Sequence, residues 1–334
     1  NHKALLTLAL LWCAATASCG GGESASMSET QSDTGAGGTN PGASGQAVAE
    51  KESRYFEFES CKEVERLFEE LNYTPEAWQA GVREVPRVYI TKVSERWRAK
   101  TTKEISVQTK KGLFFRALAP LVLHANELIV ADRQRVEALA IVRALESLSP
   151  EEQQWLNELA ARYKIDLVKG EIAAAHVDEL LRRVDIVPVS LALSQGAEES
   201  GWGTSRFAAE GNALFGQWTW GENAMKPKRQ RASLGNYGLA AFETPLESVL
   251  AYIHNLNTHR AYTELRTRRA ELRAAAEPLS GRALAKTLTR YSERGADYVK
   301  TLHVIMSVNQ LDAADAAYLG NGPAIYLVPV GEGV

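Results

Sequence analysis

Two adjacent glutamates, Glu198 and Glu199, end an apolar stretch of the chain just before a turn rich in glycine and tryptophan. A carboxyl group at the C-terminal end of a helix lies beside the negative end of the helix dipole, and rings such as Trp202 and Phe215 would exclude water from it. Both effects raise the pKa of a carboxyl group, as a general acid requires. Because helical neighbours point about 100° apart, at most one of the two glutamates can face a given cleft.

Aromatic side chains are concentrated around these glutamates, and flat rings suit the faces of sugars. Each ring taken singly belongs to a core more often than to a ligand site, and two glutamates at a helix end are most simply solvated charges. The concentration of rings nevertheless favours a carbohydrate site. The rings are Trp202, Phe215, Trp218 and Trp220.

Apolar residues recur at helical spacing through most of the chain from Tyr55 onward. Two capping-box patterns, at residues 149–152 and 244–247, each place proline at the first helical position. We therefore predict a mostly α (α+β) fold. The predicted helical stretches are residues 113–122, 125–143, 150–163, 178–184, 188–200, 245–256, 284–291 and 298–308.

Two regions depart from the helical pattern. Residues 214–242 are aromatic, basic and glycine-bearing, as expected for a small β-hairpin or loop lobe. The tail from Leu311 to Val334 contains Pro323, Pro329 and four glycines, so we expect it to be peripheral.

The N-terminal segment predicts export. Residues 4–17 form an apolar run of 14 residues, which is too short for a bilayer span of about 20 residues and suits the core of a signal peptide. Residues 15–17 are typical of an ordinary cleavage site, whereas residues 16–19 resemble a lipobox that ends at Cys19. Residues 20–49 contain eight glycines, five serines and no aromatic residue, as in a disordered tether. We predict lipid attachment at Cys19, and a secreted soluble protein is the alternative.

Composition and charge argue against several classes of protein. The 334 residues carry 38 basic and 41 acidic side chains, so no basic excess favours a nucleic acid as partner. Three cysteines are too few for a disulfide framework, and no Cys/His cluster has zinc-ligand spacing. His254 and His259 are five residues apart, whereas two ligands on one helical face stand four apart. We expect no metal or cofactor, and we interpret Cys61 as a small buried apolar residue.

Several collinear motifs resemble one known family. ESGWGTS at 199–205, followed by NALFG at 212–216, resembles the signature of the bacterial glucosaminidases of glycoside hydrolase family 73. FGQW at 215–218, YIHNLNTHRAY at 252–262 and RYSERGADYV at 290–299 resemble the Bax-like branch of that family, as does FFRALAPLVLHANELIVADR at 114–133. The resemblance covers roughly residues 86–312 and implies a lysozyme-like catalytic domain that acts on peptidoglycan.

The resemblance also implies roles for individual residues. The glutamate of the family motif maps onto Glu199 as general acid and leaves Glu198 as a bystander. The catalytic tyrosine maps onto Tyr291, with Tyr298 as the second aromatic residue of that motif. For Asn212, a structural role in a turn is the alternative to a hydrogen bond with substrate. The residues expected to bind substrate are Trp202, Asn212, Phe215, Gly216, Gln217, Trp218, Glu222 and Tyr298.

The sequence leaves two alternatives for the second catalytic group. Glycosidases commonly pair the acid with another carboxylate, about 5–5.5 Å away for retention or about 6.5–9.5 Å for inversion. Between Ser200 and Phe242 only Glu210 and Glu222 are acidic, and Glu243 follows at once. One route is inversion through Glu222. The other is substrate assistance, in which the 2-acetamido oxygen of the sugar attacks the anomeric carbon and Tyr291 orients that group.

These features together predict an exported, lipid-anchored and monomeric peptidoglycan hydrolase of the bacterial cell envelope, which cleaves the β-1,4 bond after N-acetylglucosamine. A lytic transglycosylase or muramidase on the same fold is one alternative. A catalytically inactive glycan-binding envelope protein is the other. The predicted order is a signal peptide at 1–18, a tether at 19–50, a helical N-terminal region at 51–170, the catalytic domain at 171–312 and a C-terminal tail at 313–334.

Overall fold

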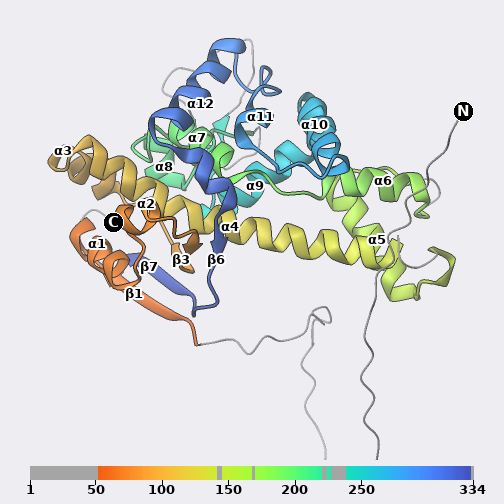
Figure 1. Ribbon diagram of the computed structural model, residues 1–334, viewed down its shortest axis with the longest axis horizontal. Coiled ribbons are helices and arrows are strands. Elements are labelled where there is room, and N and C mark those ends of the chain that lie inside the picture. Colours follow the sequence, from red (N-terminus) through yellow and green to blue (C-terminus); the bar gives the residue numbers. More distant parts are fainter. Residues whose placement is uncertain (1–51, 141–144, 168–169, 220–223, 227–237, 332–334) are drawn as a thin grey trace, which may run out of the picture. The chain divides into compact units, whose positions relative to one another are not determined.

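The computed structural model describes residues 52–140, 145–167, 170–219, 224–226 and 238–331 (Figure 1). The predicted signal peptide, the tether and Cys19 lie outside the described residues, and so does Glu222.

Helices make up most of the described chain, and the prediction of a mostly α fold with few strands is confirmed. The helices up to the glutamates are α1 (Cys61–Glu70), α2 (Pro75–Gln79), η1 (Trp97–Thr101), α3 (Thr102–Glu104), α4 (Val107–Ala140), η2 (Leu145–Ser147), α5 (Pro150–Arg162), α6 (Ala174–Arg183) and α7 (Val189–Ser200). Those that follow are α8 (Arg206–Gly211), α9 (Pro245–Thr258), η4 (Arg260–Tyr262), α10 (Thr263–Ala274), α11 (Gly281–Ala285), α12 (Ala296–Val308) and η5 (Leu311–Ala316). The strands are β1 (Arg54–Phe58), β2 (Glu84–Val85), β3 (Val88–Ile90), β4 (Trp218–Thr219), β5 (Gly238–Leu239), β6 (Tyr318–Leu319) and β7 (Ile325–Pro329).

Both predicted capping residues cap their helices. The Ser149 hydroxyl accepts from the Glu152 amide, and the Glu152 carboxylate accepts from the Ser149 amide, which closes a reciprocal box before α5. Before α9, Thr244 accepts from the Glu247 amide. The Glu247 carboxylate there accepts from the amide of residue 243, so the second half of the box lies one residue earlier than the pattern predicts.

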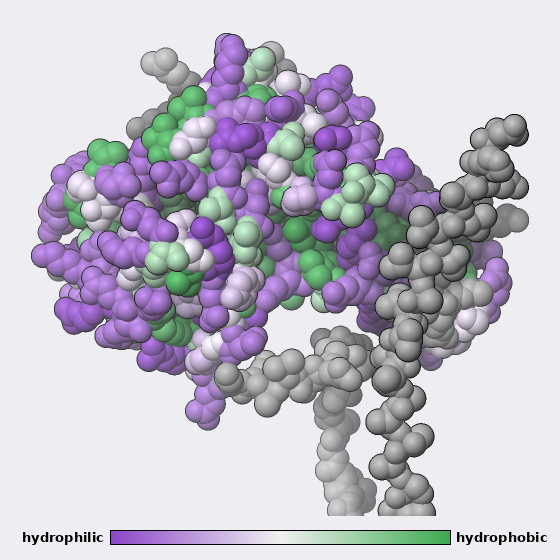
Figure 2. Space-filling model, viewed as in Figure 1, coloured by the Kyte–Doolittle hydropathy of each residue, from purple (hydrophilic) through white to green (hydrophobic). Residues whose placement is uncertain are grey.

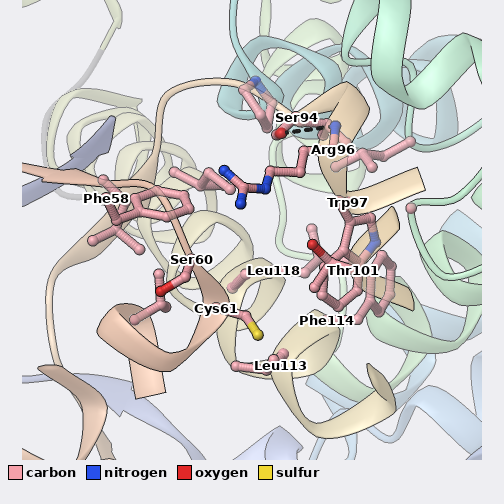
Figure 3. Close-up of a pocket in the computed structure, with 18 of the residues that line it drawn as sticks. Phe58, Ser60, Cys61, Ser94, Arg96, Trp97, Thr101, Leu113, Phe114 and Leu118 are labelled. Carbon is pink, nitrogen blue, oxygen red and sulfur yellow. Dashed lines mark hydrogen bonds between the residues drawn. The ribbon is translucent and has the colours of Figure 1, made fainter. Parts of the chain in front are cut away.

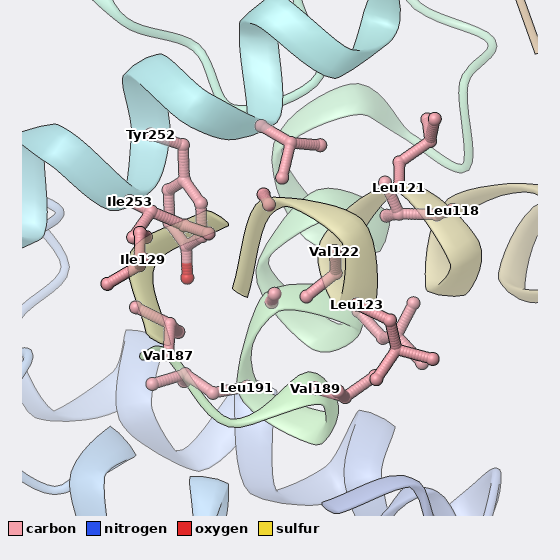
Figure 4. Packing of buried hydrophobic residues seen from close by; sticks show 14 of the residues in the cluster. Leu118, Leu121, Val122, Leu123, Ile129, Val187, Val189, Leu191, Tyr252 and Ile253 are labelled. Carbon is pink, nitrogen blue, oxygen red and sulfur yellow. The ribbon is translucent and has the colours of Figure 1, made fainter. Parts of the chain in front are cut away.

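The longest helix, α4, lies in the middle of the core. The stretches predicted at 113–122 and 125–143 join into one helix that contains Pro120. Although α4 is long and apolar enough to cross a bilayer, most of its apolar stretch is buried, and it contacts α6, α7, α9 and β3. Figure 4 shows its side chains, Val122 among them, packed together with Leu191 of α7 and Tyr252 of α9. We interpret α4 as a core helix that holds α7 and α9 in place.

The C-terminal tail is not peripheral, and that prediction is wrong. β7 is the central strand of a three-stranded parallel sheet of order β1-β7-β3, in which Ile325 lies opposite both Arg54 and Val88. Ile325 and Leu327 are 4% and 1% exposed, because alternate residues of β7 face the core. The N-terminal region is likewise not purely helical, since it supplies β1, β2 and β3.

The predicted hairpin lobe is present, since β4 and β5 pair in antiparallel fashion and Met225 forms a further bridge to Leu239. The helix predicted at 284–291 is wrong, because α11 covers Gly281–Ala285 and residues 286–291 are not helical. There the Thr287 hydroxyl donates to the Leu284 carbonyl at 2.7 Å, a local hydrogen bond that competes with continuation of the helix.

A buried ion cluster ties the connection between α6 and α7 to α4 and α10. Asp185 in that connection is 2% exposed, and Arg273 donates to both of its carboxylate oxygens, at 2.7 and 3.2 Å. Arg133 and the fully buried Arg269 lie 3.6 Å from the same carboxylate. Burial alone would raise the pKa of Asp185, but the hydrogen bond from Arg273 and the three positive charges hold it below its usual range.

The described fold contains two cavities of note. An apolar pocket of about 120 Å³ is enclosed by β1, α1, η1 and the first half of α4, and Cys61, Trp97 and Leu118 line it (Figure 3). The Cys61 thiol is free, and burial raises its pKa. A groove of about 690 Å³ lies near the N-terminal end of α7, where Figure 2 shows hydrophobic side chains recessed over the middle of α4.

Candidate active site

The turn that ends α7 has the backbone conformation that its glycines allow. Gly201, Trp202 and Gly203 all have positive φ, at 57°, 63° and 73°, a region that glycine enters at little cost and other residues rarely adopt. The Ser200 hydroxyl is buried, donates to a backbone carbonyl one turn earlier in α7 and accepts from the Gly203 amide. The turn therefore holds Glu199 in the last turn of the helix, as the sequence predicts.

The Glu199 carboxyl group is enclosed by protein. A Cβ placed on Gly216 would lie 3.3 Å from Glu199 Oε2, so the NALFG segment passes directly over the carboxyl group. Burial raises the pKa of Glu199 and the charge of Glu198 adds to this, while hydrogen bonding from the Tyr298 hydroxyl and the charge of Arg294 act in the opposite sense. The net result is a raised pKa, which suits a group that must carry a proton at neutral pH.

Tyrosine rings gather beside Glu199. Tyr291 and Tyr298 stack with ring centroids 5.4 Å apart and planes 6° apart, and Tyr262 lies 5.7 Å from Tyr291. Tyr252 stacks on Phe215 at 3.9 Å. Burial is the first cause of a raised pKa for each of these four tyrosines, and for Tyr262 the value is about 12. Their hydroxyl groups are therefore protonated donors at neutral pH.

The two tyrosines of the predicted motif have different hydrogen-bond partners. The hydroxyl that faces the Glu199 carboxyl group as a hydrogen-bond donor is that of Tyr298. The Tyr291 hydroxyl instead donates to the backbone carbonyl of Phe215 at 3.1 Å. The direct partner of the acid is thus Tyr298, and Tyr291 fixes the segment that covers Glu199.

Glu198 has a separate set of contacts. Its carboxylate pairs with Arg294 at the surface, and Arg294 also donates to the hydroxyl of Thr301. Adjacent positions on one helix thus give one glutamate a solvated ion pair and the other an enclosed site.

Comparison with known proteins identifies the family of the chain. Residues 174–311, which run from α6 into η5, match the glucosaminidase family described as mannosyl-glycoprotein endo-beta-N-acetylglucosaminidase. Protein bax of Escherichia coli (strain K12) is 35% identical over 201 residues, which cover 60% of this chain and 70% of that protein. The chain belongs to the Bax-like glucosaminidase family. It is accordingly a glycan-cleaving hydrolase. No solved structure matches the chain.

Trp202, which is predicted to bind substrate, packs against α4. Its ring packs edge-on against Phe114 and Phe115 of α4, with centroids 5.8 and 5.1 Å away, and the Lys111 ammonium lies 4.9 Å from the ring centre. Its backbone carbonyl accepts from the Trp97 indole. Trp202 therefore ties the catalytic turn to α4.

Asn212 lies in the turn that follows α8, as in the alternative, structural interpretation of this residue. It has a φ of 50°, and its side-chain oxygen accepts from the Val93 amide at 2.9 Å while its nitrogen donates to the carbonyls of Phe242 and Glu243. The buried side chain of Asn212 is thus fully engaged with backbone. Phe215 is also buried: its carbonyl accepts from the Tyr291 hydroxyl, and its ring stacks on Tyr252.

The remaining predicted binding residues lie on the segment between Gly216 and the hairpin. Gln217 precedes β4, its carbonyl accepts from the Ala240 amide, and its side-chain nitrogen is buried without a partner among the described residues. Trp218 begins β4 and pairs with Leu239.

The acidic residues that follow Glu199 do not gather around it within the part of the chain described. Glu210 pairs with Arg206 on the exposed face of α8, and Glu243 lies exposed before the cap of α9. The other candidate, Glu222, lies outside the described residues.

Metal-binding clusters of three or more His, Cys, Asp or Glu side chains are absent from the described residues. His254 lies against the Tyr163 ring and its Nε2 contacts the Arg162 carbonyl, and His259 caps η4. Both histidines thus have packing or capping roles, as their spacing indicates.

Sequence reasoning missed two residues that lie next to Tyr298, beside the candidate acid. Gln195 and Tyr252 are both fully buried; the Tyr252 hydroxyl donates to Gln195, and Gln195 donates to the Tyr298 hydroxyl. The signal that could have found Gln195 is a polar side chain in an apolar helix, four residues before Glu199 and therefore on the same face.

Proposed function

We propose that this glucosaminidase is an exported peptidoglycan hydrolase that cleaves the β-1,4 bond after N-acetylglucosamine, with Glu199 as general acid. The observation that carries the proposal is the enclosure of Glu199 at the end of α7, between Gly216 and the Tyr298 hydroxyl. A carboxyl group with a raised pKa retains its proton until a better acceptor approaches.

In the reaction, Glu199 gives its proton to the glycosidic oxygen as the bond to the anomeric carbon breaks. The carboxylate that remains is stabilised by hydrogen bonding from Tyr298. The anomeric carbon is then attacked either by the 2-acetamido oxygen of the same sugar or by a water that Glu222 activates. Glu222→Gln distinguishes the two routes, because only the second loses its base in this variant.

The proposed setting is the bacterial cell envelope. A signal peptide over residues 1–18 would direct export, and an acyl group on Cys19 followed by the tether would anchor the enzyme to a membrane while it reaches peptidoglycan strands. Cys19→Ala should then move a monomeric enzyme from the membrane to the soluble fraction, and an unchanged membrane fraction would contradict the anchor.

The acid is tested by one pair of variants in a cell-wall turbidity assay. Glu199→Gln should lose about 10²–10⁴ in rate, because general acid catalysis is worth that much. Glu198→Gln, the matched control on the same helix turn, should stay within about tenfold, since it removes only an exposed ion pair. Equal rates for the two variants would contradict the assignment of Glu199.

The bond that is cleaved is tested by the products. Digested peptidoglycan is reduced with borohydride, hydrolysed and examined by mass spectrometry. Glucosaminitol supports the proposed glucosaminidase, because this enzyme leaves N-acetylglucosamine at the new reducing end. Muramitol would indicate a muramidase, anhydro-muropeptides would indicate a lytic transglycosylase, and undigested strands would indicate a module that only binds glycan.

A further inference from the structure

A chain of buried hydrogen bonds leads to Glu199 from the interior of the protein. Tyr252 Oη donates to Gln195 Oε1 at 2.7 Å, and Gln195 Nε2 donates to Tyr298 Oη at 2.9 Å. The Tyr298 hydroxyl faces Glu199 as donor. Tyr252 and Gln195 are fully buried and Tyr298 is 1% exposed, so water does not compete for these groups.

The direction of this chain is set by the orientation of the Gln195 amide. A tyrosine hydroxyl has one hydrogen, and an amide has donors only on nitrogen and acceptors only on oxygen. Because Tyr252 gives its hydrogen to Gln195 Oε1, the amide presents its N–H to Tyr298. The Tyr298 oxygen then accepts from Gln195, and its own hydrogen is left for Glu199. The opposite amide orientation would place Oε1 on Tyr298 and draw that hydrogen away from the acid.

We propose that Gln195 is a positioning residue that holds the Tyr298 hydroxyl with its single hydrogen directed at Glu199. Gln195 does not touch the reacting atoms and acts only through Tyr298. The inference rests on the proposed role of Glu199 as general acid, and it adds a residue that sets how readily this acid releases its proton.

Occupation of the Tyr298 oxygen is the physical reason for the effect. While Gln195 donates to it, that oxygen is a poor acceptor for the proton of Glu199, and the hydroxyl stabilises the carboxylate form. Without the Gln195 N–H, Tyr298 can instead accept a hydrogen bond from protonated Glu199, which stabilises the acid form. Removal of Gln195 should therefore raise the pKa of Glu199 further and slow proton release to the leaving group.

Other groups around Glu199 also act on its titration, and all must be kept constant. The charged side chains that face it are Glu198 on α7 and Arg294 before α12. The hydroxyl groups whose pKa the charge of Glu199 raises belong to Tyr252 on α9, Tyr262 on η4, Tyr291 and Tyr298. A substitution at Gln195 changes none of these charges.

The test uses Gln195→Met, which keeps the length of the side chain and removes both polar groups. We expect kcat to fall about tenfold with little change in KM, and the basic limb of the pH–rate profile to move up by about one pH unit. Ser194→Ala is the matched control, because Ser194 is an equally buried neighbour in α7 whose hydroxyl bonds only within the helix. It should leave the profile unchanged.

A readout independent of activity separates this inference from the proposed function. The side-chain carboxyl carbon of Glu199, assigned by its absence in Glu199→Gln, is titrated by NMR in the full-length protein. Gln195→Met should raise its pKa whether or not peptidoglycan is cleaved. An unchanged pKa of Glu199 in folded Gln195→Met would overturn the inference and leave the glucosaminidase assignment intact.

A double-mutant cycle tests that Gln195 acts through Tyr298. In the Tyr298→Phe background the hydroxyl is absent, so Gln195→Met should shift the pKa of Glu199 no further. The same shift with and without the hydroxyl would overturn the proposal. If Gln195→Met does not fold, Tyr252→Phe serves in its place: it keeps the ring stacked on Phe215 but releases the amide, and it should also raise the pKa of Glu199.

Discussion

At the scale of single residues, environment rather than residue type distinguishes the two adjacent glutamates. Glu198 forms a surface ion pair with Arg294, whereas Glu199 is enclosed and has a raised pKa. Because the folded protein binds the Glu199 proton more tightly than the unfolded chain does, this group costs stability as the pH rises from its unfolded pKa through its folded pKa. Glu199→Gln should therefore be at least as stable as the natural protein at neutral pH, and its loss of activity cannot come from unfolding.

Gly216 is a second residue whose surroundings explain its type, because its backbone conformation and its closeness to Glu199 both favour glycine. It has a φ of 60°, and a methyl group there would approach Glu199 Oε2 to 3.3 Å. We expect Gly216→Ala to lose about tenfold in kcat/KM or more, because the carboxyl group must shift by a few tenths of an ångström, and small misplacements of catalytic groups are costly. The left-handed backbone alone should cost about 1–2 kcal/mol of stability.

Gly81 provides the control for this substitution. It also has a positive φ, at 95°, but a methyl group there would meet no atom within 4 Å. Gly81→Ala should lower the melting temperature to a similar extent and leave turnover unchanged. Full turnover by Gly216→Ala would show that the backbone over Glu199 does not position the acid.

At the scale of elements, the connection between α6 and α7 is held by charge as well as by apolar packing. Asp185 lies among Arg133, Arg269 and Arg273, contributed by α4 and α10. Asp185→Asn leaves these arginines without their counter-charge, and we expect it to cost about 3–5 kcal/mol of unfolding free energy. Asp312→Asn, which removes an exposed pair with Arg282, should cost at most about 1 kcal/mol in the same denaturant titration.

The pH dependence of Asp185 has the opposite sign from that of Glu199. Because its folded pKa is held below the unfolded value of about 3.9, its contribution is complete above that pH and is lost as the pH falls through the folded pKa. Asp185→Asn should therefore lose less stability in acid than the natural protein does. Parallel stability curves for the two proteins would contradict this account of the cluster.

The elements near the acid could be predicted because local chemistry specifies them. Ser149 and Thr244 start helices by capping free backbone amides, and Gly201 ends α7, wherever the rest of the chain lies. The order of contacts inside the site could not be predicted. The family motif singles out Tyr291 as the catalytic tyrosine, whereas the hydroxyl that hydrogen-bonds with Glu199 belongs to Tyr298, whose helix α12 packs against α7.

At the scale of the whole described fold, strands from near the two ends of the described residues pair in one sheet. β7 lies between β1 and β3, and the strands are parallel, so no local turn signal in the sequence joins them. The prolines and glycines of the tail indicate irregular structure, and the alternation of buried residues over Ile325–Pro329 is too short to outweigh them. Such long-range pairing is what a single sequence reveals least.

Removal of β7 tests how far this sheet supports the enzyme. A chain that ends at Gly322 loses the buried Ile325 and Leu327 and leaves the facing edges of β1 and β3 unpaired. Each buried aliphatic side chain is worth about 1.5–3 kcal/mol, so the loss is a large share of a typical total of about 5–15 kcal/mol. Because β3 contacts α4 and α4 holds α7, we expect the melting temperature to fall by about 10 °C or more and cell-wall hydrolysis to fall with it. A chain that ends at Gly331 keeps β7 and should melt like the natural protein. Equal melting temperatures and equal activities for the two truncated chains would restore the view of the tail as a peripheral segment.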